Sequence, residues 1–325
     1  SKYGSVISSF YNAATVDGIN EKGLVANVLY LADADYGSPE GKPTLNIAAW
    51  AQYVLDNYST VAEAVEALQK EPFRIVAPTL PGGVAAVGHL SISDASGDSA
   101  ILEYLKGKLV IHHGPQYKVM TNEPPYDQQL AINEYWKDVK GEDFLPGTSR
   151  PADRFVRASY YINAIPGRPD PAYISAVPGR DLSAQSIASV LGVIRDISVP
   201  LGISTEGAPN VASTTWRTVA DQSSRIYYFD SATSPNTFWV DLSKLEITEG
   251  SSVKKLTVSG GEIYGGEVSG KFQTSEPFAW LPENAGAQDA PKAPSPAKTT
   301  PAGHATPPAA PNPPFKGPSS ATKNG

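Results

Sequence analysis

The sequence of 325 residues predicts an α+β fold, in which antiparallel sheets are joined by helical segments. Two observations predict it. Short apolar runs come in pairs around tight turns, which is typical of antiparallel hairpins. Helical patterns are inserted between these pairs and do not alternate with single strands, so a doubly wound parallel sheet is not expected. The sequence also lacks a Gly-rich phosphate loop and a Gly-x-Ser-x-Gly elbow.

The chain opens with a predicted strand at residues 3–10, in which apolar positions alternate. A loop of small residues leads to a turn at Asn20–Gly23, which an asparagine opens and a glycine closes with positive φ. Residues 24–31 form a buried strand, so two strands around this four-residue turn make a hairpin. Asn27 is polar within that apolar strand and needs partners if it is buried.

Further elements follow from the same patterns. A helix is predicted over residues 45–55, and a second one starts at Thr60, where Thr60 to Glu63 match a capping box. Helix 182–197 lies further along the chain. The remaining predicted strands are 74–78, 88–94, 99–104, 109–112, 211–219, 225–229 and 238–240, with 95–98 and 221–224 as turns.

A strand ending at Met120 leads to Asn122, and a double proline follows at 124–125. Because prolines stop a β-ladder and fix the direction of a loop, Asn122 lies at a strand end just before a rigid loop. Functional groups are often placed at such strand ends. An Asx turn that caps the loop accounts for the same residue equally well.

The stretch 145–161 begins with a Pro-Gly turn and continues as a helix, with Pro151 at its first position. Arg154 lies in the first turn, where the helix dipole disfavours a cation. Two interpretations follow from these residues. Arg154 forms a surface ion pair with the adjacent Asp153, the more common arrangement, or the preceding turn directs Arg154 into a functional site.

Composition excludes several classes of function. The net charge of −7 argues against nucleic acid as the main partner, and no apolar run approaches a membrane span. Cysteine is absent, so the chain contains no disulfide, thiolate metal site or cysteine nucleophile. The four histidines, at 89, 112, 113 and 304, lack metal-site spacing. We therefore expect no metal and no cofactor.

Three segments are predicted. Residues 1–248 form the core, 249–280 a weak β extension, and 281–325 a tail of mainly Ala, Pro, Thr and Lys. Such a tail cannot bury enough apolar surface to offset its chain entropy, and we expect it to be disordered. The chain starts at Ser1 without an initiator methionine or a signal peptide, which indicates a processed or cut end.

Four separated stretches resemble the choloylglycine hydrolase family, which includes bile salt hydrolases and penicillin V acylases. They are DGINEKGL at 17–24, VMTNEPPYDQQ at 119–129, LPGTSRPADRFVRA at 145–158 and STTWRTVAD at 213–221. Their order and spacing fit the family from Lys2 to Leu245. The lack of a long insertion around 130–145 is similar to the Gram-negative acylase branch.

This resemblance implies the αββα four-layer sandwich of the N-terminal nucleophile hydrolases, which hydrolyse linear amides. The family's chains start with a cysteine whose thiolate attacks the amide, while its α-amino group, with a pKa near 8, handles the proton. The resemblance also implies a small-molecule acyl amide substrate, no cofactor, a possible homo-oligomer and a periplasmic or secreted location. Phenoxyacetyl, bile-acid and N-acyl homoserine lactone amides all remain open as substrates.

Three site residues carry over from the family by position. Asn122 matches the asparagine whose amide donates to the oxyanion. Tyr30 matches the residue whose backbone N–H is the second donor and whose side chain lines the substrate pocket; an aromatic residue there is similar to the penicillin acylases. Arg154 matches the arginine near the nucleophile, where a cation favours the thiolate.

One departure from the family is large, because its opening strands and their cysteine have no counterpart in this sequence. The chain is therefore expected to be N-terminally truncated and to lack the first strands of the fold. Ser1 is not expected to replace the cysteine, since the matching stretches place Ser1 elsewhere. Two functions stay open: an incomplete amidohydrolase, or an inactive acyl-amide-binding relative or gene product.

Overall fold

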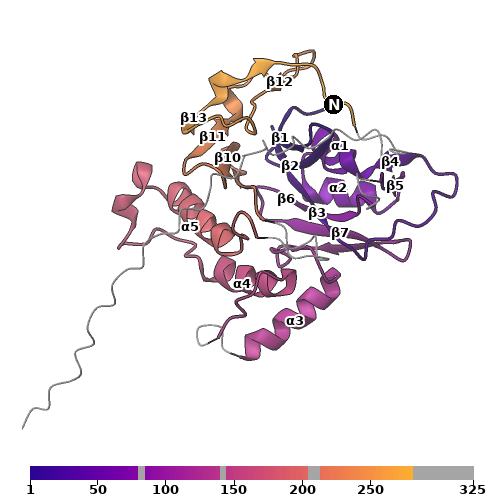
Figure 1. Cartoon of the computed structure of the whole chain (residues 1–325), viewed down its shortest axis with the longest axis horizontal. Coiled ribbons are helices and arrows are strands. Elements are labelled where there is room, and N and C mark those ends of the chain that lie inside the picture. The colour runs from indigo at the N-terminus through magenta and orange to yellow at the C-terminus, as the bar shows by residue number, and fades with distance from the viewer. Residues whose placement is uncertain (80–84, 140–143, 204–212, 281–325) are drawn as a thin grey trace, which may run out of the picture. The chain divides into compact units, whose positions relative to one another are not determined.

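The computed structural model describes residues 1–79, 85–139, 144–203 and 213–280 (Figure 1). Its largest sheet has six antiparallel strands in the order β1-β2-β3-β6-β7-β8. These strands are β1 Ser5–Phe10, β2 Ala14–Asn20, β3 Val25–Tyr30, β6 Gly88–Ser93, β7 Ser99–Leu105 and β8 Lys108–His113. The hairpin predicted around residues 95–98 is confirmed. The turn at 20–23 is confirmed as well, but the strand that pairs with β3 across it is β2, where a loop was predicted.

A second sheet has the order β13-β11-β10-β9. Its strands are β9 Trp216–Asp221, β10 Ile226–Ser231, β11 Thr237–Asp241 and β13 Gly266–Glu267. Strand β13 belongs to the segment predicted as a weak β extension and pairs in parallel with β11. Two short pairs complete the strands: β4 Thr44–Asn46 with β5 Arg74–Val76, and β12 Lys254–Lys255 with β14 Gln273–Thr274.

Helices cover the outer faces of both sheets. Helices α1 Trp50–Asn57 and α2 Val61–Leu68 pack on one face of the six-stranded sheet, against residues such as Leu24, Ala26 and Leu90. The opposite face, with Val6, Ile19 and Val25, packs on Tyr227, Phe229 and Val240 of the second sheet. Helix α5 Leu182–Asp196 lies on the outer face of that sheet through Arg195, which binds Asp230. These layers have the order α, β, β, α.

Two more helices carry the middle of the chain beside these sheets. They are α3 Tyr126–Asp138 and α4 Pro151–Ala164, which contact each other. Tyr126 and Phe155 from these helices pack on Ile101 of β7. Within the described residues, none of the helices is long and apolar enough to cross a membrane.

A buried polar group joins the two sheets at Asp17. Its carboxylate accepts hydrogen bonds from Asn27 Nδ2 at 2.6 Å, from Tyr227 Oη at 2.7 Å and from the Thr218 hydroxyl. Asn27 thus has the partner that a polar residue in this strand needs. Burial raises the pKa of Asp17, and these hydrogen bonds lower it in part.

Several predicted elements are wrong in detail. Residues 117–120 do not form a strand, because Tyr117, Val119 and Met120 pack their side chains onto the Ile101 cluster and do not extend the sheet. The helix predicted from residue 45 begins later, since 44–46 pair with β5. A 3₁₀ helix at Ile47–Ala49 leads into α1, which starts at Trp50.

Other boundaries differ as well. Strand β9 starts at Trp216, because Thr214 is bound to Val199 through its backbone N–H and its hydroxyl. Strand β2 and helix α3 were not predicted as separate elements. Residues 211–212 and the predicted disordered tail from 281 lie outside the described residues.

Candidate active site

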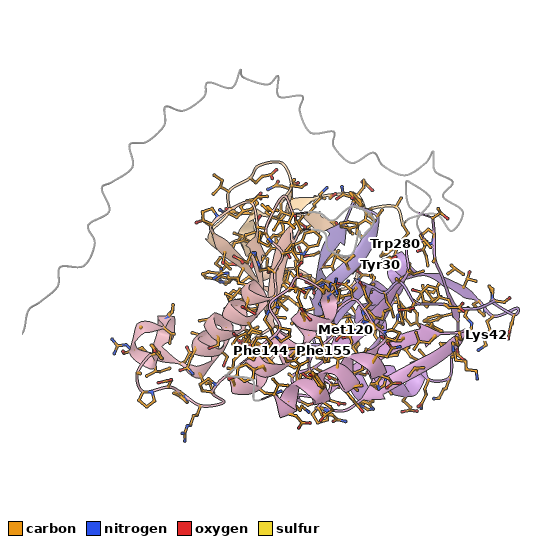
Figure 2. The ribbon with its side chains drawn as sticks, turned by 60° about the horizontal axis from the view of Figure 1, so that its bottom comes forward. Tyr30, Lys42, Met120, Phe144, Phe155 and Trp280 are labelled. Atoms are coloured by element: carbon orange, nitrogen blue, oxygen red, sulfur yellow. The ribbon has the colours of Figure 1, made fainter. Side chains whose placement is uncertain are left out.

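Asn122 and Tyr30 are far apart in sequence and meet in the structure. The side-chain amide of Asn122 donates from Nδ2 to the backbone oxygen of Tyr30 at 3.0 Å. Both residues are half-buried. Figure 2 labels Tyr30 together with Met120, which lies two residues before Asn122 and packs on the cluster of Phe155 in α4. The loop after Met120 therefore meets the end of β3.

Arg154 faces the same loop. Its Nη2 donates to Asn122 Oδ1 at 2.8 Å, and its Nε donates to the backbone oxygen of Ser149 at 3.0 Å. Asp153 turns to Thr148 instead, accepting from the Thr148 hydroxyl at 2.5 Å. The interpretation of Arg154 as a surface partner of Asp153 is therefore wrong. Because Arg154 binds the oxygen of the Asn122 amide, the nitrogen end of that amide is directed towards Tyr30.

The Arg154 side chain is half-buried, so its charge is only partly exposed to water. Burial lowers the pKa of Arg154; Glu123 raises it and Arg157 lowers it further. An arginine side chain stays protonated even so. Its positive charge is screened less by water than a charge on the surface, so it acts more strongly on an anion nearby.

The backbone of Tyr30 is directed by the pairing of β3. Leu31 donates its N–H to the oxygen of Val87, on the β6 side of the strand. Backbone groups alternate in an antiparallel ladder, so those of Tyr30 face the opposite edge. The pairing with β2 ends there at Asp17 and Asn27. The N–H of Tyr30 thus points to the same edge as its carbonyl, which Asn122 binds.

Ser1 lies at the other end of this sheet. The backbone N–H of the following Lys2 donates to the oxygen of Asp56 at 2.8 Å, at the end of α1. Strand β1 begins beside Asn20, at the end of the hairpin away from Tyr30. The length of β3 alone is roughly 17 Å at the usual rise per residue. The structure therefore does not bring Ser1 to Asn122, Tyr30 and Arg154.

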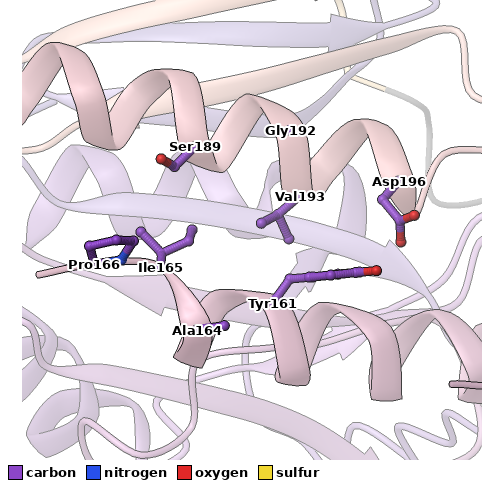
Figure 3. Close-up of a pocket in the computed structure, with 8 residues that line it drawn as sticks. All are labelled: Tyr161, Ala164, Ile165, Pro166, Ser189, Gly192, Val193 and Asp196. Atoms are coloured by element: carbon purple, nitrogen blue, oxygen red, sulfur yellow. The ribbon is translucent and has the colours of Figure 1, made fainter. Parts of the chain in front are cut away.

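A cavity of about 370 Å³ lies between α4 and α5 (Figure 3). Its walls are mainly apolar, with Tyr161 and Val193 facing each other across it. The carboxylate of Asp196, which lines the cavity, accepts a hydrogen bond from Arg157 Nε at 3.1 Å. Tyr161 lies nearly two turns beyond Arg154 along α4, and Asn122 does not line the cavity. This cavity is therefore separate from the candidate site.

Sequence reasoning missed the residues that support Asn122. Helix α3 begins directly after the double proline, and Gln129 on its buried face binds the loop. The signal was present in the stretch 119–129, where a turn fixed by prolines precedes polar and apolar residues at helical spacing. Within the described residues, no cluster of three or more His, Asp or Glu side chains could hold a metal ion.

Comparison with known proteins shows the family of the chain. Residues 3–256 match the family of linear amide C–N hydrolases, choloylglycine hydrolase family. Penicillin V acylase of Pectobacterium atrosepticum is 50% identical over 294 residues, which are 86% of this chain and 77% of that protein.

Solved structures give the same result. Penicillin V acylase from Agrobacterium tumefaciens matches with a TM-score of 0.76 and 50% identity, over 86% of this chain and 84% of that one. A variant of conjugated bile acid hydrolase from Clostridium perfringens has a TM-score of 0.57 at 23% identity, over 72% and 74% of the two chains, and supports the fold alone. The chain belongs to the choloylglycine hydrolase family of linear amide C–N hydrolases.

Proposed function

We propose that Asn122, Tyr30 and Arg154 form the carbonyl-binding side of an amide hydrolase of the penicillin V acylase type. The observation that carries this proposal is the orientation of the Asn122 amide, whose oxygen binds Arg154 and whose nitrogen faces Tyr30. An asparagine amide has two N–H donors, and Tyr30 uses one of them. Among the residues that the structure describes, Tyr30 is the one acceptor of Asn122 Nδ2, so the second N–H can bind the oxygen of a substrate amide.

In the proposed reaction, a thiolate adds to the carbonyl carbon of a linear amide and the carbonyl oxygen becomes an oxyanion. Asn122 Nδ2 and the backbone N–H of Tyr30 donate to that oxyanion. Donors already in place stabilise the developing charge without reorganisation, by a few kcal/mol each. Arg154 holds the Asn122 amide and supplies a positive charge that favours the thiolate over the thiol.

The thiolate is not supplied by these residues. The sequence contains no cysteine, so hydrolysis by this route needs a thiol from outside these 325 residues. The same observation favours a second candidate function, an acyl-amide-binding relative without catalysis. The two differ in one measurable respect, the release of the acyl group as a free acid.

We propose penicillin V, with its phenoxyacetyl arm, as the substrate type. Two observations support it: the aromatic side chain of Tyr30 at the site, and the 50% identity to a penicillin V acylase over most of both chains. The half-buried Tyr30 ring can pack against an aromatic acyl group.

The test uses an active form in which cysteine-bearing opening strands precede Ser1. Asn122→Ala should lower kcat by about 10²–10³ and change KM far less, because the amide oxygen carries full charge only in the tetrahedral state. Tyr30→Ala is the matched comparison: its backbone N–H survives, so KM should rise with a milder effect on kcat. An unchanged kcat in Asn122→Ala would leave Asn122 as a loop-capping residue only.

A further inference from the structure

Gln129 binds the backbone on both sides of Asn122. Its Nε2 donates to the oxygen of Thr121 at 3.0 Å and to the oxygen of Pro124 at 2.6 Å. Its Oε1 accepts from the N–H of Thr121 at 3.3 Å. Gln129 is fully buried, so these hydrogen bonds are shielded from competition with water. Through them, one side chain of α3 binds the backbone before and after Asn122.

The double proline limits the hydrogen bonds that the loop can form by itself. Pro124 and Pro125 lack backbone N–H groups and cannot donate hydrogen bonds. Gln129 supplies a donor for two carbonyls of this segment, those of Thr121 and Pro124. The Thr121 hydroxyl also donates to the oxygen of Pro151 at 3.0 Å. Because Pro151 begins the helix that carries Arg154, the same contacts influence the distance between Arg154 and Asn122.

Helix α3 is itself anchored to the large sheet. Its N-cap residue Pro125 has no side-chain hydrogen bond to cap the helix. The carboxylate of Glu103 on β7 takes that role, accepting from the N–H of Tyr126 at 3.0 Å. Glu103 lies 2.8 Å from Nδ1 of His89, and both side chains are fully buried. A carboxylate at a helix N-terminus is favourable, so Gln129 is presented from a rigid support.

We propose that Gln129 is a positioning residue, which holds the backbone around Asn122 so that the Asn122 amide faces Tyr30. This inference rests on the proposed role of Asn122 in binding the substrate carbonyl. Donors in such sites must be held within about 0.5 Å of their working geometry. Asn122 directly follows Thr121, whose backbone N–H and oxygen both bind the Gln129 amide, so this amide determines where the Asn122 side chain begins.

The experiment compares two glutamines of the same helix in the full chain. Gln129→Met keeps the length of the side chain and removes its amide. Gln128→Met makes the same change at an exposed neighbour and is the matched control. The readout is the side-chain amide signal of Asn122 in ¹H–¹⁵N NMR spectra, with the fully buried Asn20 as internal reference.

In Gln129→Met, we expect the Asn122 amide signals to shift and their protons to exchange about tenfold faster, as the contact with Tyr30 opens. Asn20 should not change, and Gln128→Met should leave both residues as in the wild type. Unchanged Asn122 signals in a folded Gln129→Met protein would overturn the proposal.

A second variant tests the proposal if Gln129→Met folds poorly. Gln129→Glu keeps the volume and the acceptor for Thr121, but loses the donor to Thr121 and Pro124, and should shift the Asn122 signals in the same way. If neither variant folds, Gln129 serves general stability and the proposal is overturned. Failure here is distinct from failure of the proposed function, because these signals do not depend on turnover, whereas the kcat of Asn122→Ala does.

Discussion

Replacing Asn20 by alanine tests how the first hairpin is held to helix α1. Asn20 is fully buried and its Nδ2 donates to the oxygens of Leu55 and Tyr58 at 2.9 and 2.8 Å. Its Oδ1 accepts from the N–H groups of Lys22 and Leu24 at 3.0 and 3.1 Å. Alanine removes all of these contacts and leaves polar groups unpaired in the core. With a net contribution of about 1 kcal/mol from each hydrogen bond, we expect a loss of about 4 kcal/mol.

Urea unfolding of both proteins measures this loss as a change in the free energy of unfolding at equal m-value. Asn57→Ala is the control, because Asn57 is half-buried and its amide donates one hydrogen bond, to the oxygen of Tyr53 at 2.7 Å. There we expect a loss of about 1 kcal/mol or less. If Asn20→Ala costs no more stability than Asn57→Ala, the argument from buried hydrogen bonds is refuted.

Three further predictions concern the chain as a whole. The 325 residues alone should not hydrolyse penicillin V or glycocholate, since they contain no cysteine; turnover that disappears in Ser1→Ala would contradict this. Deleting the residues from 285 onward should leave the melting temperature unchanged, and a clear drop would show that they stabilise the folded core. Burial raises the pKa of Asp17 above its ordinary 3.8, so the stability linked to its protonation is present below that value and is lost as pH rises through the folded pKa. The free energy of unfolding of the neutral Asp17→Asn variant should therefore rise relative to that of the wild type as pH increases from below 3.8 through the folded pKa. If urea unfolding gives the same difference between the two proteins at every pH, burial is not the cause of the shift.

Local patterns in the sequence were enough to predict much of the fold. The hairpin turns, the start of α2 at Thr60 and the start of α4 at Pro151 all depend on residues within one turn of each other. The Thr60 hydroxyl accepts from the N–H of Glu63 at 3.2 Å, as the capping pattern predicts. The strand predicted at 117–120 failed for the opposite reason. Its apolar residues suit a strand, but packing on the distant Ile101 decided their conformation.

In the candidate site, too, the sequence predicted some features and the tertiary structure decided others. Resemblance to the family pointed to Asn122, Tyr30 and Arg154 from short stretches of sequence, but those stretches did not show which groups bind each other. Adjacent residues favoured Asp153 as the partner of Arg154. In the structure, Asp153 binds Thr148, which is 5 residues away and also local. Tertiary packing places Arg154 against Asn122, which is 32 residues away. Partners in a buried site are chosen by which segments the sheets and helices bring within hydrogen-bond distance, and spacing along the chain does not contain that information.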